Sequence, residues 1–100
     1  MGARTRKGLP PIHPGEVLQE ILNEAGLTVN ALALRVPANR IGGILKRERG
    51  ITADTALRLG RYFGTSAQMW MNLQAKYELA VAEDSLRGRL EREVLRRAAA

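Results

Sequence analysis

Residues 28–50, which read TVNALALRVPANRIGGILKRERG, decide the fold. Thr28 is a favourable N-cap for a short helix, and this helix must break close to Pro37. A second helix is predicted over residues 38–47. Its inward face consists of three aliphatic residues, Ile41, Ile44 and Leu45. Two short helices joined by a tight turn are typical of a helix-turn-helix, whose second helix fits the major groove of DNA.

A longer helix precedes this stretch. Pro14 suits the first turn of a helix, and Gly26 is the residue type that ends one. Apolar residues recur between them at helical spacing, and these are Val17, Leu18, Ile21, Leu22 and Ala25. We therefore expect one helix from Pro14 to Gly26, with this apolar face packed on the core.

Two further helices follow the stretch. Thr52 and Ser66 are N-cap residues, and Gly64 lies between them as a stop signal. The first of these helices is expected to bury Ala56, Leu57, Leu59 and Phe63. The second reaches about Glu83 and carries an apolar stripe of Trp70, Leu73, Tyr77 and Val81. Because no strand-like alternation or internal repeat occurs, the predicted class is all-α with five to six helices.

Composition divides the chain into three segments. Residues 1–11 are expected to form a flexible basic arm, and residues 12–84 hold the helix-turn-helix domain with its dimerisation helix. Residues 85–100 carry five arginines and two glutamates. Three apolar residues recur there at steps of four, namely Leu86, Leu90 and Val94. This basic amphipathic stretch fits a sixth helix or a tail. It would serve as a dimer arm, which we favour, as a second phosphate contact, or as a segment that folds on a protein partner.

The composition also excludes several classes of site. The 100 residues include no cysteine and a single histidine, so no disulfide, thiolate zinc site or histidine cluster can form. No catalytic triad, carboxylate pair or glycine-rich phosphate loop can be assembled, and we predict no catalytic residue, metal or cofactor. No secretion signal and no apolar run long enough for a membrane span occurs, which favours a cytoplasmic protein without a membrane partner.

Positive charge is concentrated around the predicted second helix, residues 38–47, which is called the reading helix because it would enter the major groove. Sixteen Lys and Arg against ten Asp and Glu give a formal charge of +6, which favours a polyanionic partner. Residues 28–50 hold five basic residues and one acidic residue, whereas residues 9–27 hold three glutamates and no Lys or Arg. A DNA-binding surface would need this distribution to neutralise phosphates. For any single Lys or Arg, the simpler interpretation is a solvated charge on the surface of a helix.

Three side chains near the second helix are candidates for reading bases. Asn39 can pair with two edges of adenine, Arg40 can form a bidentate contact with guanine, and Lys46 is a third candidate. Thr28, which fits a helix cap equally well, and other residues at the helix ends are candidates for phosphate contacts. The outward face is predicted to be Asn39, Gly42, Gly43 and Lys46. The full predicted DNA-binding set is Thr28, Asn30, Ala38, Asn39, Arg40, Gly43, Lys46, Arg47 and Arg49.

The histidine and the large aromatic residues are assigned structural roles. His13 stands beside a proline at the entry to a helix with no second ligand nearby, so we interpret it as structural. Trp70 and Tyr77 could stack on bases, but their helical spacing with Leu73 favours packing in the core or in a dimer. The predicted dimerisation residues are accordingly Trp70, Leu73, Tyr77 and Val81.

Six short segments carry a resemblance to a known family. They are HPGE at 13–16, VPANRI at 36–41, RGITADTALRL at 49–59, YFGT at 62–65, WMNLQ at 70–74 and YEL at 77–79. Through them the chain resembles HigA-type antitoxins of the Cro/repressor-like (XRE) helix-turn-helix family, over roughly residues 12–84. The combination is far more specific than a helix-turn-helix pattern alone.

The resemblance implies a function and two partners. It implies a Cro/repressor-like helical domain that forms a homodimer largely through C-terminal helices. It also implies sequence-specific binding to double-stranded operator DNA, repression of the protein's own operon, and neutralisation of a HigB-like ribonuclease toxin that cleaves messenger RNA. The chain itself would carry no catalysis.

Two departures from the family pattern qualify this expectation. Two residues are missing before Leu34, which would place Ala31 at the helix crossing and push Leu32 toward the rim. Gly42 and Gly43 stand where the family more often has a polar or charged pair. They would allow close approach to the groove or, as we prefer, remove side chains that specify bases. The alternative function is therefore a toxin-binding helical module with weak or lost DNA binding.

Overall fold

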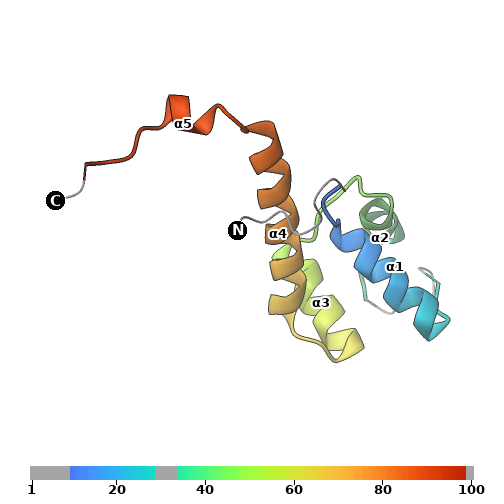
Figure 1. The fold of residues 1–100 in the computed structure, drawn as a ribbon. Helices are drawn as coiled ribbons and strands as arrows, with labels where there is room; N and C mark the ends of the chain where they lie inside the picture. The colour runs from blue at the N-terminus through green and yellow to red at the C-terminus, as the bar shows by residue number, and fades with distance from the viewer. Residues whose placement is uncertain (1–9, 29–33, 99–100) are drawn as a thin grey trace.

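A computed structural model describes residues 10–28 and 34–98, and in these ranges the chain is all-helical, with no strand. The helices are α1 (Pro14–Ala25), α2 (Ala38–Leu45), α3 (Ala53–Phe63), α4 (Ala67–Ser85) and α5 (Leu90–Glu93) (Figure 1). The all-α prediction is therefore confirmed. The predicted short helix after Thr28, the residue Asn30 and most of the basic arm fall on residues outside these ranges.

Capping residues set the ends of the helices where the sequence predicted them. His13 is the N-cap of α1, and Gly26 ends that helix in the left-handed conformation with a φ of 68°. The side chain of Thr52 caps α3, which Gly64 ends with a φ of 74°. Ser66 caps α4 in the same way as Thr52 caps α3, because its hydroxyl accepts a backbone N–H of the first turn.

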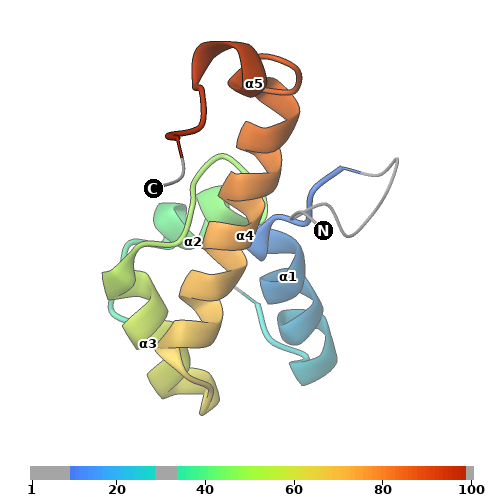
Figure 2. The ribbon, with the colours of Figure 1, turned by 60° about the vertical axis from the view of Figure 1, so that its left-hand side comes forward.

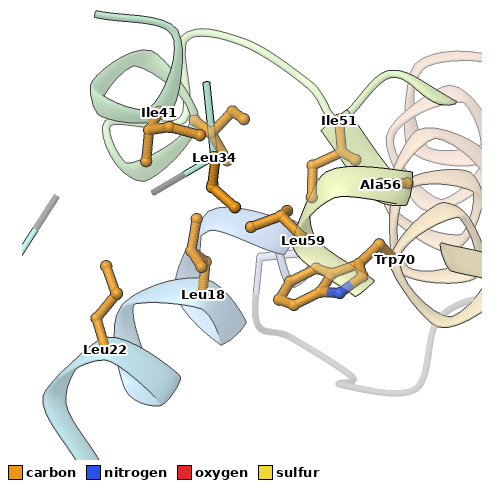
Figure 3. Packing of buried hydrophobic residues seen from close by; sticks show 9 residues of the cluster. Leu18, Leu22, Leu34, Ile41, Ile51, Ala56, Leu59 and Trp70 are labelled. Carbon is orange, nitrogen blue, oxygen red and sulfur yellow. The ribbon is translucent and has the colours of Figure 1, made fainter. Parts of the chain in front are cut away.

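The hydrophobic core lies where α1 packs against both α2 and α4, and α3 packs along α4. Figure 3 shows Leu18 of α1, Leu34 of the turn before α2 and Leu59 of α3 converging at its centre. The buried cluster consists of Leu18, Leu22, Leu34, Ile41, Ile44, Ile51, Ala56, Leu59 and Trp70. Helix α2 thus packs directly on α1, and its Ile41 and Ile44 share this core with residues of α3 and α4.

Two residues of the predicted apolar faces lie outside the core. Leu57 is 65% exposed, because the buried face of α3 runs through Thr55, Ala56 and Leu59 and residue 57 points away from it. Ala25 is exposed because it is the last residue of α1, at the end of the helix farthest from the other helices (Figure 1). The predictions that these two side chains are buried were wrong.

The apolar stripe of α4 divides between the core and the surface. Trp70 is completely buried and donates its indole N–H to the hydroxyl of Thr65 at 3.0 Å. It cannot form part of a dimer surface, so that part of the predicted dimerisation set was wrong. Leu73 and Tyr77 are half-buried, and Val81 is 41% exposed.

The chain beyond α4 forms a tail. The single-turn helix α5 lies past the C-terminal end of α4 (Figures 1 and 2), and Figure 1 shows it apart from the other helices. Every residue from 87 to 98 is exposed. None of the helices in the described ranges has the length and apolar character needed to cross a membrane.

Candidate nucleic-acid interface

The second helix of the predicted helix-turn-helix is α2, and it is anchored by one face. Ile41 and Ile44 are buried in the core on that face. Asn39 and Lys46 are exposed, and Arg40 is half-buried. The structure therefore brings the three candidate base-reading residues together on α2 and its C-cap, and each has a side chain that reaches the surface. Their hydrogen-bonding groups suit the edges of bases in a major groove.

Gly43 does not lie on the outward face, and that prediction was wrong. The residue is buried, and a Cβ added to it would lie 2.8 Å from Cδ of Arg49. The chain after α2 folds back so that the aliphatic part of Arg49 covers this turn of the helix. Gly42 differs from it, because a Cβ there would meet nothing within 4 Å. Of these two glycines, Gly42 is the one that leaves bare backbone with open space beside it.

The C-terminal end of α2 is closed by a left-handed residue. The N–H of Glu48 donates to the carbonyl of Gly43 at 2.8 Å, and the N–H of Arg47 donates to Ile44 at 3.0 Å. These two bonds form a Schellman motif, in which the left-handed position usually holds glycine. Here Arg47 occupies it with a φ of 64°. Its Nε lies 3.6 Å from Oε2 of Glu16 on α1, so its charge faces a carboxylate as well as solvent.

The turn before α2 is tied to α3. Leu34 is buried, and its carbonyl accepts a hydrogen bond from Nη1 of Arg58 at 3.0 Å. Arg58 also pairs with Asp54 at 2.7 Å through its Nε. The next residue, Arg35, has a φ of 60°. The turn therefore enters α2 through a left-handed residue whose neighbour is held by an arginine of another helix.

The first turn of α1 contacts the opposite end of α2. Nδ1 of His13 accepts the N–H of Gly15 at 2.9 Å, and the backbone N–H of His13 donates to Glu16 at 3.2 Å, which completes a capping box. A Cβ on Gly15 would lie only 2.1 Å from the carbonyl oxygen of Ile44. Glycine is thus required at this helix–helix contact, and His13 has the structural role expected of it.

The pKa of His13 is lowered from its ordinary value of 6.5. Burial of the imidazole is the largest cause, and the positive charge of Arg47 adds to it. The carboxylate of Glu16 and a backbone hydrogen bond with Arg49 act in the opposite direction. The neutral imidazole is therefore the form that the folded protein favours.

Comparison with known proteins places this arrangement in a family. Virulence-associated protein I of Dichelobacter nodosus is 55% identical over 78 residues, which cover 75% of this chain and 72% of that protein. An addiction module antidote protein of the HigA family from Coxiella burnetii superposes with a TM-score of 0.82 at 42% identity, covering 89% of this chain and all of the other. The chain belongs to the HigA family of antitoxins. No family model matches it.

A second solved relative of this HigA-family chain is bound to DNA. The antitoxin HigA of Pseudomonas aeruginosa, determined with the higBA promoter, is 50% identical and superposes with a TM-score of 0.81. The comparison covers 84% of this chain and 95% of the Pseudomonas chain. The two solved antitoxins agree with the family expected from the sequence.

The structure of this HigA-family chain separates the predicted DNA-binding residues into groups. Asn39, Arg40 and Lys46 share α2 and its C-cap, with Ala38 exposed at the first turn. Arg47 and Arg49 lie in the loop after α2, and Thr28 is exposed beyond the end of α1. Among residues 10–28 and 34–98, no group of His, Asp or Glu could hold a metal ion.

Sequence reasoning missed the residues that orient α2 in this HigA-family fold. Gly15 touches Ile44, and Arg58 holds the turn before α2 through Leu34. Glycine has a low helix propensity, so its presence in the first turn of α1 was a signal that another part of the backbone packs closely against this position. The role of Arg58 had no such signal, because its i, i+4 pairing with Asp54 is what any surface helix offers.

Proposed function

We propose that this protein is a homodimeric antitoxin that binds double-stranded operator DNA through α2, represses its own operon and neutralises a HigB-like ribonuclease toxin. The observation that carries the DNA-binding part is the anchored α2 helix, which buries Ile41 and Ile44 and leaves Asn39 and Lys46 exposed and Arg40 half-buried. The relative solved with the higBA promoter supports DNA binding by this fold.

The charge of the loop after α2 supports backbone contacts beside the reading residues. Lys46, Arg47 and Arg49 are all exposed, and phosphate contacts by such residues set the register of a reading helix. We assign base reading to Asn39 and Arg40 and backbone contacts to Arg47. Gly43 has no part in this proposal, because it lies beneath Arg49.

Homodimer formation is proposed to use the exposed end of the predicted apolar stripe of α4. Val81 belongs to this stripe and is 41% exposed, whereas Leu79 lies two residues away on the opposite side of the helix. Leu73 and Tyr77 contribute only the parts of their side chains that reach the surface. Residues 12–84 form the domain in this proposal, and residues 85–100 form the tail. We propose no catalysis, since the relatives are antitoxins and transcriptional regulators.

A mobility-shift titration tests the DNA-binding role. The protein is titrated onto its own upstream duplex and a scrambled duplex at two salt concentrations. We expect the native duplex to bind at least about a hundredfold more tightly, with affinity falling as salt rises. Arg40→Ala is expected to reduce the preference about tenfold or more, whereas Arg61→Ala, an exposed arginine of α3, should leave it unchanged.

The second candidate function is a toxin-binding helical module that has lost DNA recognition. Gly42 favours it, because this position of α2 offers no side chain to a base. The same titration separates the two functions. Equal and weak binding to both duplexes would contradict operator recognition, and co-purification with the toxin encoded beside the gene would then support the module.

A further inference from the structure

His13 is the single histidine of the chain and lies at the junction of three elements. It is buried, with 3% of its surface exposed, and its ring meets Tyr77 of α4 edge-on at 4.7 Å between centroids. On α1 it is the N-cap, and the backbone of Arg49, in the loop after α2, acts on its ring in the direction that raises its pKa. The His13 imidazole therefore lies between α1, α4 and the loop after α2.

The hydrogen bonding of the ring requires its neutral form. Nδ1 accepts the N–H of Gly15, so this nitrogen carries no proton and the ring proton resides on Nε2. A protonated imidazole has two donors and no acceptor. Protonation would therefore leave the N–H of Gly15 without its partner and place a positive charge at a helix N-terminus, where the helix dipole disfavours it.

The same turn of α1 holds the end of the reading helix. Gly15 packs directly on the carbonyl of Ile44, the second-last residue of α2. Glu16, the third residue of α1, receives the backbone N–H of His13 and faces Nε of Arg47 at 3.6 Å. Loss of the cap would loosen both contacts, and Lys46 and Arg47 lie immediately beyond the point they hold.

We propose that His13 is a positioning residue for operator binding: its neutral imidazole holds the end of α2, and its protonation releases α2 and weakens binding to DNA. This inference rests on the proposed function. It gives the antitoxin an acid-sensitive affinity for its operator, through a residue that touches no nucleotide.

Charged groups on two elements act on the protonation of the His13 ring. On α1 the carboxylate of Glu16 stabilises the imidazolium, and in the loop after α2 the guanidinium of Arg47 opposes it. Tyr77 of α4 contributes an uncharged ring. Burial of His13 adds to the opposition and lowers its pKa. Histidine is the only side chain that ordinarily titrates between about pH 5 and pH 8. A change in DNA affinity over this range that arises from a side chain of this protein is therefore assigned to His13, its single histidine.

The test compares the full-length protein with His13→Asn. Asparagine is a good N-cap that accepts a hydrogen bond at every pH. Operator affinity is measured by fluorescence anisotropy on the upstream duplex from about pH 7.5 to about pH 5.5, and far-UV circular dichroism at each pH records the folded fraction. The wild type is expected to lose affinity progressively as the pH falls below about 6.5 while remaining folded, toward a limit of about five- to tenfold at full protonation, which corresponds to loss of one helix cap. His13→Asn is expected to show a flat profile.

Each result decides between distinct conclusions. A wild-type affinity that does not change with pH, or an equal change in His13→Asn, would overturn the positioning role. A folded fraction that falls in parallel with affinity would also overturn it, because global unfolding would then account for the loss. Absence of operator preference at about pH 7.5 would overturn the proposed function itself, whereas binding that is merely insensitive to pH leaves that function standing.

Discussion

The side-chain oxygen of Gln74 accepts the backbone N–H of Ile51 at 2.7 Å, which joins the middle of α4 to the segment that follows the reading helix. Gln74 is buried, and its amide nitrogen donates to Glu78 at 2.8 Å. Gly50 leaves the room that this side chain needs, since a Cβ there would lie 2.7 Å from Nε2. A buried amide is thus satisfied at both ends.

Replacing Gln74 by methionine should destabilise the fold. The change keeps the volume of the side chain but leaves the N–H of Ile51 unpaired, which costs about 1–3 kcal/mol of unfolding free energy. Urea denaturation followed by circular dichroism measures it. Gln68→Met is the control, because Gln68 is exposed and bonds only to Asn72 one turn away. Equal losses in the two variants would contradict the role of this hydrogen bond.

Alanine should have opposite effects at two glycines. In Gly15→Ala the new methyl group would lie 2.1 Å from the carbonyl oxygen of Ile44, and the backbone must shift to admit it. We expect a loss of roughly 1–3 kcal/mol in unfolding free energy from this overpacking. Gly42→Ala has open space and should gain about 0.5–1 kcal/mol from helix propensity. Thermal or urea unfolding measures both, and stabilisation of Gly15→Ala would refute the contact.

Stability should fall as the solution is acidified below about pH 6.5. Burial of His13 and the charge of Arg47 lower its pKa in the folded state, so the unfolded chain binds the proton first. The contribution of the neutral ring is complete above its ordinary pKa of 6.5 and is lost as the pH falls toward the lowered value. Urea unfolding at a series of pH values should show this slope in the wild type, and an undiminished slope in His13→Asn would contradict its source.

A charge on the exposed part of α4 should weaken the dimer. Val81→Lys would bury an ammonium group if this position lies in the interface, and we expect the dimer dissociation constant to rise about tenfold or more. Sedimentation equilibrium measures that constant. Ala82→Lys is the matched control, because this neighbouring residue is exposed and lies outside the predicted stripe. A dimer that tolerates Val81→Lys as well as the control would place the interface elsewhere.

Removal of the tail should leave the domain intact. A chain ending at Leu86 lacks only residues that are exposed or outside the described ranges, so its unfolding free energy should change by less than about 0.5 kcal/mol per subunit. Chemical denaturation at low concentration, where the protein is monomeric, measures this quantity. A larger loss would show that the domain extends beyond residue 84. A change confined to dimer affinity would support the predicted dimer arm.

Local signals in the sequence determined most of the helix ends. Thr52, Gly64 and Ser66 act through their own backbone neighbours, so their effects are readable without knowledge of the tertiary structure. The same is true of Pro14 and Gly26 at the two ends of α1. These residues sufficed to place three helices and the class of the fold.

The errors arose where burial depends on a distant segment. Periodicity could not distinguish Leu57 from Thr55, because the orientation of α3 is set by its packing on α4. Gly43 was assigned to the surface because nothing local indicated that Arg49 would fold back over it. The buried position of Gln74 likewise depends on Ile51, which lies 23 residues away. Pairings of this kind require three-dimensional information.

Two arginines in an unfavourable backbone conformation bracket the reading helix, Arg35 on one side and Arg47 on the other. A left-handed conformation costs a residue with a side chain roughly 1 kcal/mol, a penalty that glycine avoids. Substitution of both arginines by glycine or asparagine would therefore be expected to increase the stability of the fold. Such a protein would be more stable and would carry two fewer cations beside its candidate DNA-binding surface, so selection for stability alone would weaken the DNA binding proposed for this surface.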